Sequence, residues 1–123
     1  MVVSYASSPA AELVYSDPKL DEAPTGSLTG ENMCWRQIEF AGILKGTQNR
    51  ALAEKFIDFL LSKDFQEDMP LQMFVYPVLN DAALPEDFVK ASQTPTKAAT
   101  LGPKLIAENR DAWVQAWSDL MLK

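Results

Sequence analysis

Apolar residues recur at the spacing of a helical turn in two long segments of this chain. Leu52, Phe56 and Phe59 fall on one stripe in 48–61, and the segment 103–121 carries a longer stripe with the same period. A stripe of this kind predicts an amphipathic helix that packs one face against a core. Including the shorter candidates, the expected helices are 9–15, 48–61, 63–68, a turn over 86–90, and 103–121.

Capping residues and prolines mark where these helices begin and end. Pro9 suits a first helical turn because its φ is fixed near the helical value, and Ser8 before it is a candidate cap. Thr47 and Ser62 are candidate N-caps for the two middle helices. Pro70 removes a backbone donor, so we expect the helix that begins at 63 to end before it.

Other segments have the pattern of extended chain. Residues 2–6 read as a buried strand, and 27–45 alternates in a way that predicts one or two strands. The segment 69–78 lies between Pro70 and Pro77 and is expected to be an extended segment or a rigid loop. Helices mixed with a few strands predict an α/β or α+β architecture.

The composition narrows the possible partners. The chain has 123 residues, the length of one ordinary domain, with 47% hydrophobic and 23% charged residues, which are globular proportions. Its formal charge of −6 disfavours nucleic acid and anionic membranes, since both need clustered Lys and Arg. We therefore expect no nucleic-acid partner and favour a neutral or cationic small ligand.

The titratable residues argue against most catalytic chemistry. There is no histidine, which removes Ser-His-Asp and Cys-His catalysis and imidazole metal ligands. Cys34 is the single cysteine, so no disulfide can form within the chain. An enzyme that uses Cys34 or a serine as nucleophile remains an alternative, but it would need a Lys or carboxylate base. We expect no enzyme activity, no cofactor and no metal.

A series of short motifs runs through almost the whole chain in order. These motifs are 3–9, Arg36-Gln37-Ile38-Glu39-Phe40, 49–61, Phe65-Gln66-Glu67-Asp68-Met69-Pro70, Val75-Tyr76-Pro77-Val78 and Asn109-Arg110-Asp111-Ala112-Trp113. Together they resemble the C-terminal part of thiamine-binding substrate-binding proteins of ABC importers, in the two-lobed superfamily of type II periplasmic binding proteins. The wider group includes binders of ferric iron.

The resemblance implies an architecture and a location. The expected fold is the C-terminal segment of a two-lobed α/β protein, with few strands, packed helices and a long C-terminal helix. Residues 1–26 would supply a strand and helix of the second lobe, 27–46 would cross the hinge, and 47–123 would complete the first lobe. We expect a fragment whose parent protein carries the signal sequence and is periplasmic or an extracellular lipoprotein.

The resemblance also implies a ligand. Thiamine contains a cationic thiazolium, which favours stacking on aromatic rings in a negative field. The family's aromatic positions fall on Tyr5 and Phe74, and Trp35 lies in a segment that borders the cleft. A further family aromatic falls on Ala11, and Tyr15, one helical turn later, is a candidate substitute.

The corner before the first helix offers a site for a phosphate. Ser7 and Ser8 precede an expected helix N-terminus, where free N–H groups and the helix dipole can hold a phosphorylated thiamine. The alternative is that Ser8 only caps the helix. The expected partners are thiamine or thiamine phosphate and the membrane permease of the transporter. We also expect the isolated fragment to self-associate. Ferric iron or another small solute is the alternative ligand.

Overall fold

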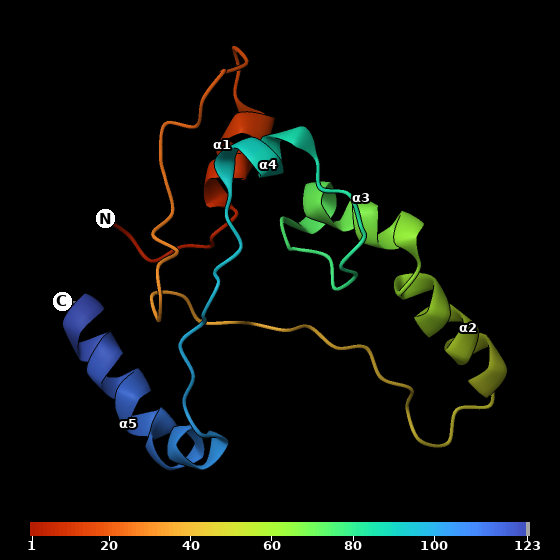
Figure 1. The fold of residues 1–123 in the computed structure, drawn as a ribbon. Helices are drawn as coiled ribbons and strands as arrows, with labels where there is room; N and C mark the ends of the chain where they lie inside the picture. The colour runs from red at the N-terminus through yellow and green to blue at the C-terminus, as the bar shows by residue number, and fades with distance from the viewer. Residues whose placement is uncertain (123) are drawn as a thin grey trace.

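Most of the regular structure is helical. The structure is a computed structural model and describes residues 1–122. Its helices are α1 (Ser8–Tyr15), α2 (Arg50–Leu60), α3 (Lys63–Met73), α4 (Glu86–Ala91) and α5 (Pro103–Met121). α1, α3 and α4 gather at one end, while α2 and α5 extend away from them in different directions (Figure 1). The described chain is therefore one packed region with two projecting helices.

The packed region centres on the contact between α1 and α4. Ala10 and Leu13 of α1 and Phe88 of α4 are at most 1% exposed. Lys19 joins the ends of the two helices, because its Nζ donates to the Leu13 carbonyl oxygen at 2.7 Å and pairs with Asp87 at 2.9 Å. A cation at the C-terminus of α1 also complements the helix dipole. This region holds the main buried apolar cluster of the described chain.

α3 is longer than the sequence predicts. Ser62 caps it as expected, since its hydroxyl accepts from the Phe65 N–H at 3.4 Å. The helix continues through Pro70, which is buried, and ends where the Phe74 N–H donates to the Pro70 carbonyl oxygen at 3.0 Å. The expectation of extended chain over 69–73 was therefore wrong. Proline removes one hydrogen bond, and its packing in the interior offsets that loss.

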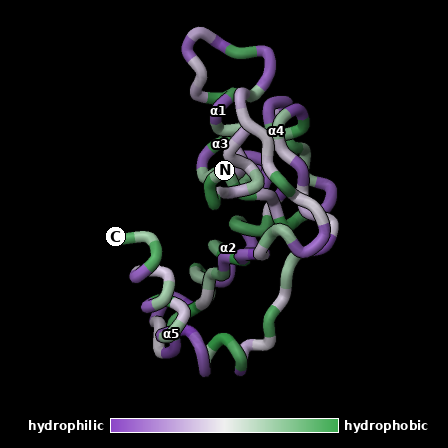
Figure 2. The backbone as a smooth tube through the Cα atoms, turned by 90° about the vertical axis from the view of Figure 1, so that its left-hand side faces the viewer, coloured by the Kyte–Doolittle hydropathy of each residue, from purple (hydrophilic) through white to green (hydrophobic). Residues whose placement is uncertain are grey.

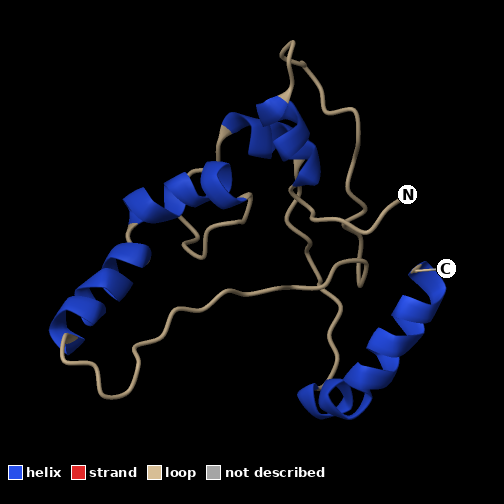
Figure 3. Cartoon of the chain, turned by 180° about the vertical axis from the view of Figure 1, so that it is seen from behind, coloured by secondary structure: helices blue, strands red, loops and turns tan. Residues whose placement is uncertain are grey.

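The expected strands do not form in the part of the chain that the structure describes. Residues 2–6 have no strand partner, and Val3 is 90% exposed. The segment 27–45 has a single isolated parallel bridge, from Trp35 to Ala99, where the Ala99 N–H donates to the Cys34 carbonyl oxygen at 2.7 Å. Figure 3 shows loops and helices throughout. A strand requires hydrogen bonds to a neighbour, which the alternating pattern cannot supply alone.

The two long helices match their predicted spans, with one difference in capping. α5 begins at Pro103 as predicted, and α4 occupies the predicted turn. The N-cap of α2 is Asn49 and not Thr47, whose hydroxyl instead accepts from the Asn49 N–H at 3.2 Å. Neither α2 nor α5 contains a buried residue, so their apolar side chains are exposed or half-buried. Figure 2 shows hydrophobic and hydrophilic residues interspersed along both helices. Among residues 1–122, no helix is both long and apolar enough to cross a membrane.

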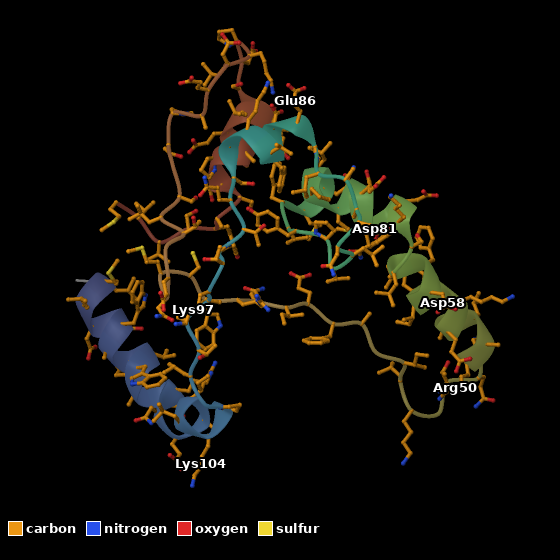
Figure 4. All side chains as sticks on the ribbon, viewed as in Figure 1. Arg50, Asp58, Asp81, Glu86, Lys97 and Lys104 are labelled. Atoms are coloured by element: carbon orange, nitrogen blue, oxygen red, sulfur yellow. The ribbon has the colours of Figure 1, made fainter. Side chains whose placement is uncertain are left out.

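The assignment of residues to lobes is not decided by this architecture. α1, from the range 1–26, and α4, from the range 47–123, share the same core. The segments around Trp35 and Lys97 cross below that core (Figures 1 and 4). The division into 1–26, 27–46 and 47–123 as parts of two lobes stays a prediction.

Candidate functional site

Three aromatic rings form a continuous series beside α1. The ring of Phe74 stacks on Phe88 with centroids 6.0 Å apart and an interplanar angle of 19°. Phe74 also contacts Tyr15 of α1, with ring centroids 5.4 Å apart and an interplanar angle of 47°. We call Tyr15, Phe74 and Phe88 the aromatic ladder. It extends from the buried core, at Phe88, to solvent, at Tyr15, which is 73% exposed.

The backbone at Phe74 is held in an unusual conformation. Phe74 has φ 55° and ψ 33°, a left-handed conformation that non-glycine residues adopt infrequently. The Ser7 hydroxyl donates to the Phe74 carbonyl oxygen at 2.5 Å, and Ser7 is only 3% exposed. One partly buried hydrogen bond therefore joins the start of α1 to the backbone at the end of α3.

The loop after Phe74 is fixed by a buried glutamine. Gln66 is 8% exposed, and its Nε2 donates to the Leu60 carbonyl oxygen at 2.7 Å. Its Oε1 accepts from the Val78 N–H, also at 2.7 Å. Tyr76, within this loop, packs edge-on against Phe88 with centroids 6.0 Å apart. The end of α2, the body of α3 and the loop are thus joined by one side chain.

Tyr5 and Ser8 lie close to Ser7 along the chain, and the Ser8 side chain does not cap α1. Tyr5 is 71% exposed, and its carbonyl oxygen accepts from the Ser8 N–H at 3.1 Å. The Ser8 hydroxyl shares a 2.7 Å hydrogen bond with the Ser4 hydroxyl. The N-cap position belongs to Ser7, which makes no side-chain capping bond. The expectation that Ser8 only caps the helix was therefore wrong.

Acidic side chains dominate the segments around the ladder. In α1, the loop 16–27 and α4, the charged residues are Glu12, Asp17, Lys19, Asp21, Glu22, Glu86, Asp87 and Lys90, six acids and two lysines. The pKa of Lys90 is raised from its ordinary value of 10.5, first by its hydrogen bond to Glu86 and the charge of Glu86, and further by Asp87 and Asp21. The local field therefore favours cations.

Comparison with known proteins places the chain in a family. Residues 36–116, about two thirds of the chain, match the sequence model of the bacterial extracellular solute-binding proteins. The chain belongs to this family. No solved structure gives a significant match.

Curated relatives of this solute-binding protein carry a more specific name. It is 31% identical over 117 residues to the thiamine-binding periplasmic protein of Salmonella typhimurium and 30% identical to that of Escherichia coli. The protein of the same name from Brucella melitensis is 31% identical over 121 residues. Each alignment covers 95% of this chain and 34% of the relative, so the chain spans about a third of the length of these relatives.

The structure of this solute-binding protein brings some of the expected site residues together. Ser7 contacts Phe74 directly, and Tyr5 and Ser8 adjoin Ser7 along the chain. Trp35 is 56% exposed and pairs through its backbone with Ala99 at the crossing, away from the ladder's own contacts. The roles of these five residues in binding a ligand stay predictions.

Two alternative functions depend on particular residues: an enzyme on the Cys34 thiol, and a binder of ferric iron on a group of metal ligands. The Cys34 thiol donates to the Leu28 carbonyl oxygen at 3.4 Å. Within residues 1–122, no group of three or more Cys, Asp or Glu side chains is placed to hold a metal ion. The relatives are named as binding proteins for thiamine, which does not favour the alternative of ferric iron.

Two residues that build the site were missed by sequence reasoning. Phe88 was placed in a turn of helix with no particular role, although it is fully buried and supports Phe74. Gln66 appeared only as part of a motif, although it anchors the loop. A glutamine inside a helix gives no sign of burial, because this residue type is mostly exposed.

Proposed function

We propose that this chain is part of the solute-binding component of an ABC importer. In this proposal the complete protein binds thiamine or its phosphate esters in a cleft between two lobes, performs no chemistry, and delivers the ligand to a membrane permease. The observation that carries the proposal is the alignment of 95% of the chain with proteins named for binding thiamine in the periplasm. The periplasm, or an extracellular lipoprotein, is the corresponding location.

The aromatic and acidic character of the region around α1 supports a cationic ligand. Tyr5, Phe74 and Trp35 are the rings we propose to contact thiamine. A contact between a ring and an organic cation contributes about 0.5 to 2 kcal/mol, depending on desolvation, so two or three rings would matter to the affinity. The six acids around the ladder add a long-range attraction for the thiazolium.

A phosphate ester would be held at the start of α1. In this part of the proposal, Ser7 and Ser8 present the helix N-terminus to the phosphate. Because the Ser7 hydroxyl already donates to Phe74, Ser7 would contribute through its position at the helix end. The Ser8 hydroxyl would bind the ligand by exchanging its hydrogen bond with Ser4. The acidic surroundings predict that the unphosphorylated cation binds more tightly than its esters.

The test is a fluorescence titration of the full-length gene product with thiamine and with thiamine monophosphate. The chain has three tryptophans and three tyrosines that report stacking of the ligand. Saturable quenching at micromolar or lower thiamine is the expected result. No response from a protein shown to be folded by circular dichroism would overturn the proposal, and a response to ferric iron in its place would support the alternative ligand.

A further inference from the structure

We propose that Tyr15 is a further ligand-contacting residue, whose ring joins that of Phe74 in one surface for a planar organic cation. The identity of the cation as thiamine rests on the proposed function, whereas the surface itself is argued from the geometry of the aromatic ladder. Tyr15 belongs to none of the sequence motifs that carry the family resemblance.

The order of the rings shows which of them is open to a ligand. Phe88 is fully buried and covers one face of Phe74. Phe74 is only partly exposed, and its ring lies at an interplanar angle of 47° to that of Tyr15. Tyr15 is 73% exposed although its ring contacts Phe74 at 5.4 Å. Tyr15 is therefore the most accessible ring of the aromatic ladder, and its ring contacts that of Phe74.

The position of Tyr15 on α1 explains how its ring reaches this place. Side chains on a helix point toward its N-terminus, so a residue covers the surface over the preceding turn. For Tyr15 that turn holds Ala11, whose side chain is a single methyl group. A methyl group takes up little of the space over that turn, and the Tyr15 ring contacts that of Phe74.

The charge around Tyr15 determines the class of ligand. Glu12 lies one turn before it on α1, Asp17 follows it two residues later, and Asp87 adjoins Phe88 at the base of the ladder. Lys19 is the nearest basic residue in sequence, and it is engaged by Asp87 and by the end of α1. An exposed ring within an acidic field is suited to a cation, whose attraction to the ring face adds to the attraction of the carboxylates.

The first experiment separates the aromatic character of Tyr15 from its bulk. In the full-length gene product, Tyr15→Phe should leave thiamine affinity within about twofold, because the ring face remains. Tyr15→Leu should weaken binding by about 2- to 30-fold, the range that corresponds to one cation–ring contact. Trp117→Leu is the matched control, since Trp117 lies on α5, is 56% exposed and has no ring partner in the described chain. Equal affinities for wild type and Tyr15→Leu would overturn the inference.

The second experiment distinguishes failure of this inference from failure of the proposed function. The protein is labelled with 3-fluorotyrosine, the Tyr15 resonance is assigned by its loss in Tyr15→Phe, and thiamine or N-benzylpyridinium is added. A saturable shift of the Tyr15 resonance with thiamine supports both proposals. A shift with N-benzylpyridinium alone supports the inference and contradicts thiamine as ligand. Thiamine binding that leaves the resonance unmoved, or no shift with either cation, overturns the inference.

Discussion

The region around α1 and α4 differs from the two projecting helices in what covers its apolar side chains. Phe88 is fully buried, whereas Phe59 of α2 is 52% exposed and Trp117 of α5 is 56% exposed. Yet α2 and α5 are 11 and 19 residues long and both carry an apolar stripe, whereas α1 and α4 are only eight and six residues long. A regular stripe therefore indicates which face of a helix is apolar, and it does not indicate that the face is covered.

This difference in burial follows from the contacts that join the helices of each region. α1 and α4 are far apart in sequence but are linked by Lys19 and by Phe74, whose ring contacts Tyr15 of α1 and Phe88 of α4. α2 contacts α3, the next helix along the chain, and α5 follows a loop whose backbone pairs with Asn32 and Cys34 through Lys97 and Ala99. Side chains far apart in sequence close the core of the first region, whereas among the described residues none on α2 or α5 is buried. The predictions below test this contrast.

The largest effect is expected from Phe88→Ala. Removing a fully buried ring leaves a cavity and takes away the support of both Phe74 and Tyr76, so the free energy of unfolding should fall by about 3 to 5 kcal/mol. Phe56→Ala on α2 is the matched control, because that ring is 57% exposed, and its cost should stay below about 1 kcal/mol. Urea denaturation followed by circular dichroism measures both. Similar losses in the two variants would mean that the regions do not differ in packing.

A smaller loss is expected from Gln66→Ala. The substitution leaves the Leu60 carbonyl and the Val78 N–H without their buried partner, which should cost about 2 kcal/mol or more. Gln72→Ala is the control on the same helix, since the Gln72 amide bonds only the exposed Asp68. Hydrogen exchange should accelerate at Val78 in the first variant and remain unchanged in the second. Protection at Val78 that survives Gln66→Ala would show that the loop is held by other contacts.

Ser7→Ala should lower the free energy of unfolding by less, about 1 kcal/mol, because it removes one partly buried hydrogen bond. The matched control is Ser118→Ala on α5, whose hydroxyl donates to the Val114 carbonyl oxygen at 2.9 Å on an exposed surface. Thiamine affinity should fall with Ser7→Ala, since the left-handed Phe74 loses its link to α1, and should not change with Ser118→Ala. Isothermal titration calorimetry measures this difference, and identical affinities for the two variants would contradict a role of Ser7 in orienting Phe74.

The helices were the most predictable part of the fold. The start of α5 at Pro103 and the cap at Ser62 follow from backbone chemistry that acts within one turn, and both were predicted correctly. Pro70 was assigned the wrong role because burial of its ring depends on residues outside α3. The strands over 2–6 and 27–45 failed for a related reason, since their hydrogen-bonding partners would have to come from distant segments.

The candidate site was predictable in its residue types but not in its arrangement. The family resemblance placed an aromatic at Ala11 and made Tyr15, one helical turn later, a candidate substitute. The structure places Tyr15 against Phe74, and its role in binding stays a prediction. The left-handed backbone of Phe74 and the hydrogen bond from Ser7 could not be read from sequence, since both depend on the meeting of α1 with the end of α3. Long-range contacts of this kind determine which surface a residue presents.

The smallest effect is expected on the pKa of Lys90 on α4. It tests whether charges on α2 act on α4. The raised pKa of Lys90 derives first from Glu86, so Glu86→Gln should return it toward 10.5 in an NMR titration of the lysine side chain. The stabilisation from this pair is fully present below pH 10.5 and is lost as the pH rises through the higher folded-state pKa, because deprotonated Lys90 no longer attracts the carboxylate. Asp58→Asn is the control, since Asp58 lies on α2, away from Glu86 (Figure 4). A Lys90 pKa that responded equally to both substitutions would show that α2 lies close enough to α4 to act as part of the same region.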